Sequence, residues 1–139
     1  YHDDGTIKEM IPHATAPQTV RKRLELDMDK AYFPEKFVVP SIEIVHDRAV
    51  AEVQRGCIRG CRFCQAGFIY RPVREKSIDM INRQCRSICE YTGYDEISLS
   101  SLSTSDYSQI EDLLDTLLSW TDNEKVSVTS ILACRRFFQ

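Results

Sequence analysis

Apolar residues from Ala49 onward alternate between two periods, and this alternation restricts the fold more than any other feature of the sequence. Period-two runs predict strands, and runs with a period near 3.6 predict helices. The expected order is strand, helix, strand, helix, strand, over residues 49–54, 78–89, 96–100, 110–118 and 126–129. Because consecutive strand–helix–strand units form a parallel sheet, we expect an α/β fold.

Two amphipathic patterns define the helices. Ser77 is the predicted N-cap of the first helix. Ser108 with Glu111 can form a capping box for the second, and Ser105 or Asp106 are the alternative caps. The predicted buried faces are Ile78, Ile81, Cys85, Ile88 and Cys89 on the first helix and Ile110, Leu113, Leu114, Leu117 and Leu118 on the second.

Each predicted strand pairs an apolar face with a polar one. The polar positions are Glu52, Gln54, Ser98, Ser100, Ser127 and Thr129. A parallel sheet covered by helices on both faces is almost entirely apolar. One polar face therefore favours a wide barrel whose bore holds a polar ligand, and the alternative is chance alternation over short windows.

Residues 1–40 are predicted to be an interdomain connector, because four spaced prolines forbid long regular elements there. Within it we expect a turn at Asp4-Gly5 and a short helix over 18–27. A strand over 42–45 and a turn over 46–48 follow. The first residue, Tyr1, and the last five, 135–139, suggest a piece of a longer chain.

Composition narrows the function classes. The chain of 139 residues is 42% hydrophobic and 28% charged with a net charge of −3, so nothing suggests nucleic-acid binding. No apolar run approaches the roughly 20 residues of a membrane span. With no visible signal peptide, the six cysteines indicate a reduced, cytoplasmic protein rather than a disulfide framework.

Three cysteines, Cys57, Cys61 and Cys64, directly follow the first predicted strand, at the rim where α/β barrels place their chemistry. Thiolates favour iron–sulfur clusters, zinc or copper(I). A closed zinc site or an electron-transfer cluster needs four ligands, so three leave one metal position open. Candidates for a fourth ligand are Cys85, Cys89 and His46, although the two cysteines suit core packing better and His46 suits a solvated turn.

Glycines and basic residues surround this triplet. Gly56 and Gly60 let the loop turn tightly and approach a bulky ligand. The basic residues are Arg55, Arg59, Arg62, Arg71, Arg74 and Lys76. They either form a solvated loop or compensate a negative cofactor.

The spacing C-x3-C-x2-C, with Phe63 before the last cysteine, resembles the radical S-adenosylmethionine (SAM) superfamily. The wider stretch 42–77 is similar to an uncharacterised bacterial radical SAM family that has a cobalamin-binding-like domain ahead of the barrel. The resemblance covers about residues 1–128. It implies that residues 41–139 are the N-terminal part of a partial (β/α)6 TIM-like barrel, the radical SAM core.

The resemblance also implies cofactors and residue roles. Cys57, Cys61 and Cys64 would ligate three irons of a 4Fe–4S cluster, and SAM would chelate the fourth iron. Phe63 would lie against the adenine, with core packing as the alternative, and Gln65 would join the cofactor site. Ser101, Ser103 and Asp106 stand where many relatives have a Gly-Gly-Glu run that holds the SAM amino group.

The implied activity is that of an enzyme. An electron donor such as ferredoxin or flavodoxin would reduce the cluster, and SAM would be cleaved to methionine and a 5′-deoxyadenosyl radical. That radical would take a hydrogen atom from an unknown substrate, and cobalamin would bind through an upstream domain outside this chain. The alternatives are a non-catalytic iron–sulfur or zinc-binding module and a redox sensor that uses Cys85 and Cys89.

The resemblance ends after Val128. We hypothesise a frameshift near Thr129, because suitable codons for 129–139, read one base later, spell a continuation typical of relatives; the nucleotide sequence tests this. In that case Cys134 has no role. The chain would hold about half of the barrel strands, so we expect it to be inactive by itself.

Overall fold

A parallel three-stranded sheet forms the centre of the molecule. The structure is a computed structural model that describes residues 1–34, 36–42, 44–124 and 126–130. The strands are β1 (Ala49–Glu52), β4 (Glu96–Ser100) and β5 (Ser127–Ser130), in the order β1-β4-β5. The predicted parallel α/β architecture is therefore confirmed.

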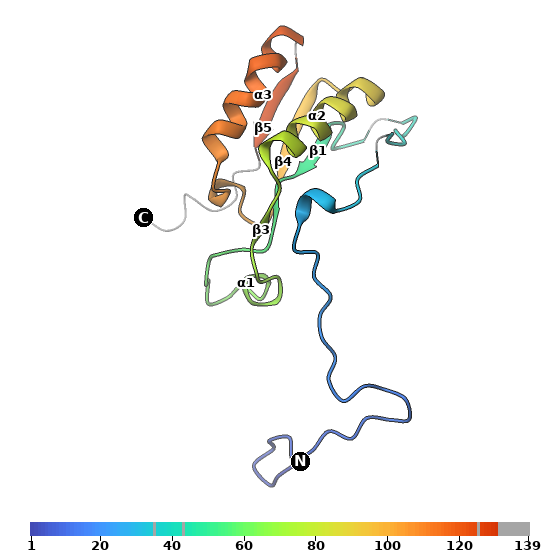
Figure 1. Ribbon diagram of the computed structural model, residues 1–139, viewed down its shortest axis with the longest axis vertical. Coiled ribbons are helices and arrows are strands. Elements are labelled where there is room, and N and C mark those ends of the chain that lie inside the picture. The colour runs from blue at the N-terminus through green and yellow to red at the C-terminus, as the bar shows by residue number, and fades with distance from the viewer. Residues whose placement is uncertain (35, 43, 125, 131–139) are drawn as a thin grey trace.

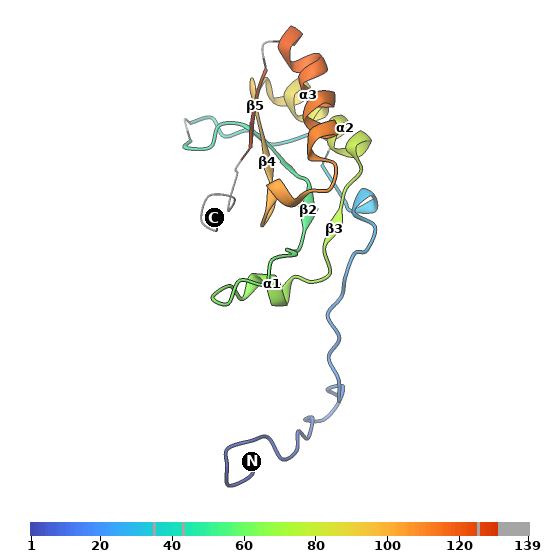
Figure 2. The same ribbon diagram turned by 90° about the vertical axis from the view of Figure 1, so that its left-hand side faces the viewer.

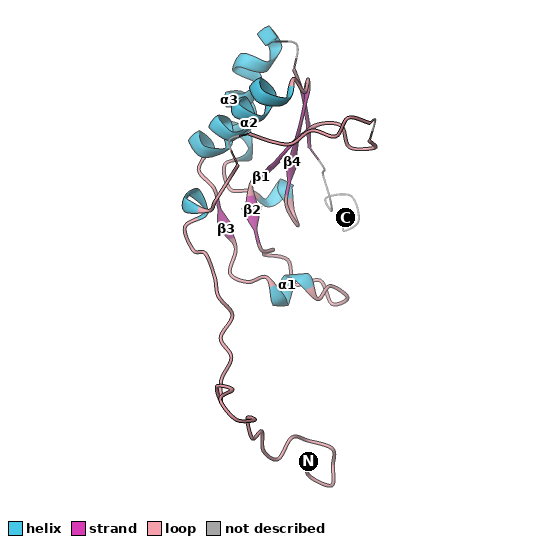
Figure 3. Cartoon of the chain, turned by 90° about the vertical axis from the view of Figure 1, so that its right-hand side faces the viewer, coloured by secondary structure: helices cyan, strands magenta, loops and turns pink. Residues whose placement is uncertain are grey.

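Two long helices, α2 (Ile78–Thr92) and α3 (Ile110–Glu124), cover the same face of this sheet (Figures 1 and 2). Figure 3 shows the helices on one side and the strands on the other. No helix covers the second face within the described residues. Three strands do not close a barrel, but this arrangement is compatible with part of a TIM-like one.

The strand register separates an apolar face from a polar one. Ala51 lies opposite Leu99 and both are buried, whereas Glu52 lies opposite Ser100 on the other face. The predicted alternation of apolar and polar residues thus corresponds to two distinct faces of the sheet. The helix-covered core consists of Ala49, Ala51, Val53, Ile81, Cys85, Ile88, Ile97, Leu99, Tyr107, Leu113, Leu117 and Trp120.

The first helix agrees with its predicted cap, and the second does not. The Ser77 hydroxyl accepts a hydrogen bond from the Met80 amide at 3.2 Å. The capping box at Ser108 is wrong, because α3 begins at Ile110 and the Ser108 amide and hydroxyl both donate to the Glu75 carboxylate.

The predicted buried face of α3 is also partly wrong. Leu113 and Leu117 are buried, but Leu118 is 43% exposed. Trp120 takes its place in the core, where its indole N–H donates to Asn82 of α2 at 2.7 Å. An indole that spans both helices fills more of the interface than a leucine, so the helix turns that side inward.

Two predictions before β1 are wrong. Residues 18–27 form no helix, and a 3-10 turn η1 (Met28–Lys30) follows them instead. Residues 42, 44 and 45 are not in a strand, and residue 43 lies outside the described residues. Both stretches lie mostly at the surface, where no sheet edge or apolar face stabilises their local pattern. The turn at Asp4-Gly5 is confirmed by a hydrogen bond from the Gly5 amide to the His2 carbonyl at 3.0 Å.

The predicted strand over 49–54 breaks in two at Val53. Its second half, β2 (Gln54–Arg55), leaves the sheet and pairs antiparallel with β3 (Arg74–Glu75). This pair closes the segment 56–73, which holds the short helix α1 (Ala66–Ile69). The segment is called the cysteine loop below, and it lies beyond the carboxyl ends of the parallel strands (Figure 2).

Part of the predicted connector contacts the domain. The Lys22 ammonium donates to the Ile69 carbonyl of the cysteine loop, and Arg74 donates to the Glu25 carbonyl at 3.2 Å. The Asp29 carboxylate accepts a hydrogen bond from the Ser77 amide at 2.8 Å. The segment before Lys22 extends away from the domain (Figure 1). No helix among the described residues is long and apolar enough to cross a membrane.

Candidate functional site

The cysteine loop is closed by backbone-to-backbone contacts at two glycines. Gly56 has φ +94°, and a Cβ there would lie 2.6 Å from the Tyr70 carbonyl oxygen and 2.8 Å from that of Pro72. At Gly67 a Cβ would lie 2.7 Å from the Arg59 carbonyl oxygen. These distances leave no room for a side chain, so the loop can close only with glycine at both positions. Gly60, which the sequence also singled out, has no such contact among the described residues.

Each of the three cysteines of this loop is partly buried, and none forms a disulfide. A backbone hydrogen bond of 3.0 Å from Cys64 to Cys61 places these two in one turn. Among the described residues, no group of three or more His, Cys, Asp or Glu is close enough to hold a metal ion. The structure thus brings the cysteines into one loop without gathering their thiols.

The three candidates for a fourth ligand lie elsewhere. Cys85 is in the helix-covered core, and burial raises the pKa of its thiol to about 12. Cys89 packs against the same core. His46 is exposed, and its Nδ1 lies 2.9 Å from the guanidinium of Arg48, just before β1 begins. The predicted core packing of the two cysteines is confirmed.

Hydrogen bonds tie the cysteine loop to the segment that follows β4. The Arg59 guanidinium binds both carboxylate oxygens of Asp106, with 2.7 Å from Nε to Oδ2. The Ser103 hydroxyl donates to the same carboxylate at 2.6 Å. The Gln54 amide nitrogen donates to the Ser103 carbonyl at 2.7 Å. Asp106 belongs to η2 (Thr104–Asp106), so this segment braces the loop rather than capping α3.

Three of the arginines in or next to the cysteine loop bind groups of the protein itself. Arg55 binds the Glu52 carboxylate, with 2.9 Å from Nε to Oε1. Arg71 donates to the Gly67 carbonyl at 2.7 Å, and Arg74 to the Pro72 carbonyl at 3.0 Å. The sequence offered two roles for the basic residues, a solvated loop or compensation of a negative cofactor. These contacts add a third role, in which guanidinium groups stabilise the shape of the loop.

A cavity of about 670 Å³ lies between the cysteine loop and the polar face of the sheet. It is lined by Val50, Glu52, Gln54, Arg55, Gly56, Tyr70, Arg74, Ser100, Ser101 and Leu102. A smaller cavity of about 300 Å³ is lined by Cys57 and Ile58 together with Arg71, Pro72 and Val73. Volumes of this size are typical of sites for small molecules.

Two oxygens on the polar face are buried without a hydrogen-bond partner in the described part of the chain: Gln54 Oε1 and Ser98 Oγ. A buried oxygen without a donor costs about 1–3 kcal/mol. Structures retain such atoms where function requires them or where a missing partner completes the site. Gln54 also lines the 670 Å³ cavity, which indicates that this part of the polar face suits a polar ligand.

Of the predicted cofactor residues, only Ser101 lines the large cavity. Its hydroxyl lies 3.0 Å from that of Thr104. Ser103 and Asp106 belong to the network that holds Arg59. Phe63 is 80% exposed on the loop, so core packing does not account for it. Gln65 is exposed too, and its carbonyl accepts the first hydrogen bonds of α1.

Tyr70 lines the large cavity but was not predicted from the sequence. Arg74 was predicted only as one of the basic residues around the triplet, and Glu52 and Gln54 only as members of the polar face. The sequence carries no signal for Tyr70, because the close approach of its carbonyl oxygen to Gly56 is visible only in the structure.

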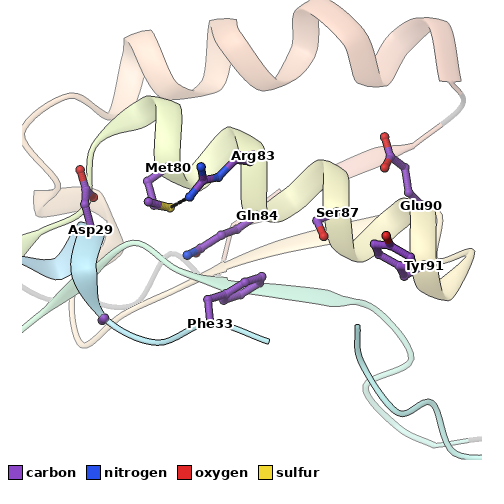
Figure 4. Close-up of a pocket in the computed structure, with 9 residues that line it drawn as sticks. Asp29, Phe33, Met80, Arg83, Gln84, Ser87, Glu90 and Tyr91 are labelled. Atoms are coloured by element: carbon purple, nitrogen blue, oxygen red, sulfur yellow. Dashed lines mark hydrogen bonds between the residues drawn. The ribbon is translucent and has the colours of Figure 1, made fainter. Parts of the chain in front are cut away.

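A further cavity of about 340 Å³ lies between α2 and the connector, and it is lined by no residue of the cysteine loop (Figure 4). Phe33 and Asp29 of the connector face Gln84 and Arg83 of α2 across it. Beside it the buried Lys76 ammonium donates to Gln84 Oε1 at 2.9 Å, and burial lowers the pKa of this amine. The connector packs against α2 around this cavity.

Comparison with known proteins gives one family and one relative. The family model described as the radical SAM superfamily matches residues 51–132. An uncharacterised protein of Methanocaldococcus jannaschii is 29% identical over 101 residues, which is 66% of this chain and 23% of that protein. The chain thus matches less than a quarter of its relative's length. No solved structure matches the chain.

Proposed function

We propose a function from one premise: the chain belongs to the radical SAM superfamily. In our proposal it is part of an enzyme that binds a 4Fe–4S cluster through Cys57, Cys61 and Cys64 and holds SAM in the 670 Å³ cavity. The observation that carries the proposal is the position of this cavity, which lies between the cysteine loop and a sheet face with polar, partly unpaired groups.

The donor set fits such a cluster. Three soft thiols in one loop suit iron, and the other candidate ligands are held in the core or before β1. Gly56 and Gly67 let the loop fold onto itself without side chains in the way. When bound and reduced, the cluster would supply an electron that cleaves SAM to methionine and a 5′-deoxyadenosyl radical.

The chain's own residues would bind and orient the cofactor. Ser101 lines the cavity and offers a hydroxyl. Gln54 donates its amide N–H to Ser103, so its carbonyl oxygen is the atom left for a donor brought by a ligand. Phe63 and Gln65 are exposed on the loop, where an adenine and its polar edge would meet them. Glu52 and Arg55 line the same wall and form an ion pair, so their two charges largely cancel there.

Partners and location follow as further proposals. The exposed Arg62 gives the loop a positive charge that an acidic electron carrier such as ferredoxin or flavodoxin would contact. The described cysteines form no disulfide, which suits the reducing cytoplasm. The substrate is unknown, and cobalamin would require an upstream domain.

The second candidate is a non-catalytic metal-binding module. Thiol chemistry alone also suits zinc. The cavity beside the loop favours the enzyme, because a closed structural site requires no space for a second molecule.

The test is anaerobic reconstitution of the full-length protein with iron and sulfide, followed by a search for 5′-deoxyadenosine in the presence of SAM and a reductant. The proposal expects this product from the wild type and from Cys85→Ala, whose thiol lies in the core. Cys61→Ala should abolish both the product and the bound sulfide. Bound zinc without sulfide in the wild type would exclude the enzyme.

A further inference from the structure

The pair Arg59–Asp106 joins two segments that are distant in sequence. Arg59 lies between Cys57 and Cys61, and Asp106 lies in η2 after β4. Both nitrogens of the planar guanidinium edge contact the two carboxylate oxygens. This two-point contact fixes direction as well as distance, which a single hydrogen bond does not.

The two partners differ in how firmly they are held. The Asp106 side chain is only 9% exposed, whereas that of Arg59 is 51% exposed. The Ser103 hydroxyl donates to the carboxylate at 2.6 Å, and Gln54 fixes the Ser103 carbonyl at 2.7 Å. Ser103 and Gln54 are both buried. Asp106 is therefore pre-oriented by the domain, and Arg59 is the partner that comes to it.

The cysteine loop needs a contact that fixes its position relative to the sheet. Its glycine contacts close the loop on itself but do not connect it to the sheet. The contact of Lys22 with Ile69 comes from the connector and reaches the α1 end of the loop. The contact of Arg59 with Asp106 joins residues 57–64 to η2, the segment that follows β4.

We propose that Asp106 is a positioning residue: by holding Arg59 it fixes the Cys57–Cys61 segment over the carboxyl edge of the sheet and so sets the site for the cluster. Only the last step, that the segment sets the site for the cluster, rests on the proposed function. It assigns Asp106 to the loop instead of to the SAM amino group, for which the sequence made it a candidate. Asp106 acts through Arg59 and need not touch the cofactor.

The experiment compares Asp106→Asn, Arg59→Lys and a control, Glu96→Gln, in the full-length protein. Glu96 forms the matched ion pair with Arg48 at 2.7 Å, at the amino-terminal ends of β1 and β4 and so at the opposite end of the strands from the cysteine loop. The first readout is amide hydrogen exchange of residues 57–64 without metal. Loss of a two-point, charge-assisted contact should speed this exchange about tenfold in both loop variants, and leave it unchanged in the control.

The second readout is spectroscopic and uses the reconstituted protein. Asp106→Asn removes a negative charge next to the loop, so the reduction potential of the cluster should rise, whereas Glu96→Gln should leave it unchanged. A general loss of folding would instead speed exchange across α2 and α3 as well. Unchanged exchange at 57–64 in both loop variants overturns the inference, whatever the metal does. Failure of the wild type to bind iron and sulfide overturns the proposed function instead, and leaves the metal-free readout to decide the role of Asp106.

Discussion

The contact between Gly56 and the far end of the cysteine loop predicts the cost of one added methyl group. In Gly56→Ala the new Cβ would lie 2.6 Å and 2.8 Å from two backbone carbonyl oxygens and 3.0 Å from the Val73 Cα. A positive φ of 94° costs a non-glycine residue about 1–2 kcal/mol. Crowding against backbone that cannot rotate away adds about 1–3 kcal/mol.

Gly93→Ala separates these two contributions. Gly93 ends α2 with φ +75°, but nothing lies within 4 Å of its Cβ position, so only the conformational cost applies. Both alanines also gain the same small benefit from a stiffer unfolded chain. The difference between the two variants should therefore equal the crowding contribution, about 1–3 kcal/mol.

The assay is urea unfolding of the metal-free protein, with the rate of iodoacetamide labelling at Cys57 as a local readout. Local opening of the loop would limit the global cost, and the labelling rate would then rise in its place. Gly60→Ala should be within about 0.5 kcal/mol of wild type, because its Cβ position is open. If Gly56→Ala matches Gly93→Ala in both unfolding and labelling, the close approach at Gly56 is wrong.

Further predictions concern the core, pH and the chain by itself. Leu117→Ala should lower the free energy of unfolding by about 3 kcal/mol, and Leu118→Ala by far less, because Leu117 is buried and Leu118 is 43% exposed; urea unfolding measures both. The pKa of Cys85 is raised by burial from 9.0 to about 12, so its contribution to folding is complete below pH 9 and is lost as the pH rises towards 12. The unfolding free energy of wild type should thus fall more steeply over that range than that of Cys85→Ala, and parallel curves would contradict this. The 139-residue chain alone should form no 5′-deoxyadenosine from SAM, since the polar face of its sheet is uncovered in the described part; mass spectrometry would detect any product.

The elements with strong periodicity could be predicted from the sequence. The strand over 96–100 has the expected bounds, and the helix after Ser77 begins where expected but continues beyond residue 89 to Thr92. Buried faces and a side-chain cap act locally, which is why these features were predictable. The weak patterns over 18–27 and 42–45 failed, since neither stretch has a partner to bury an apolar face. Local preference alone does not hold a helix or a strand in water.

Contacts over long sequence distances could not be predicted. Asp106 looked like a helix cap or a cofactor contact, yet it binds Arg59, which lies 47 residues earlier. Ser108 looked like a cap, yet it binds Glu75. A short polar side chain satisfies whichever donor the fold brings near, and the sequence does not show which one that is. The cysteine triplet was identifiable because its chemistry depends on spacing within one loop.

The proposed function depends on three thiols that leave one iron open for SAM. This is tested by the electron paramagnetic resonance spectrum of the reduced, reconstituted full-length protein before and after SAM is added. We expect an iron–sulfur signal that changes when SAM binds and that is absent in Cys57→Ala. A signal that SAM leaves unchanged at saturating concentration, or a protein that binds zinc and no sulfide, would contradict it.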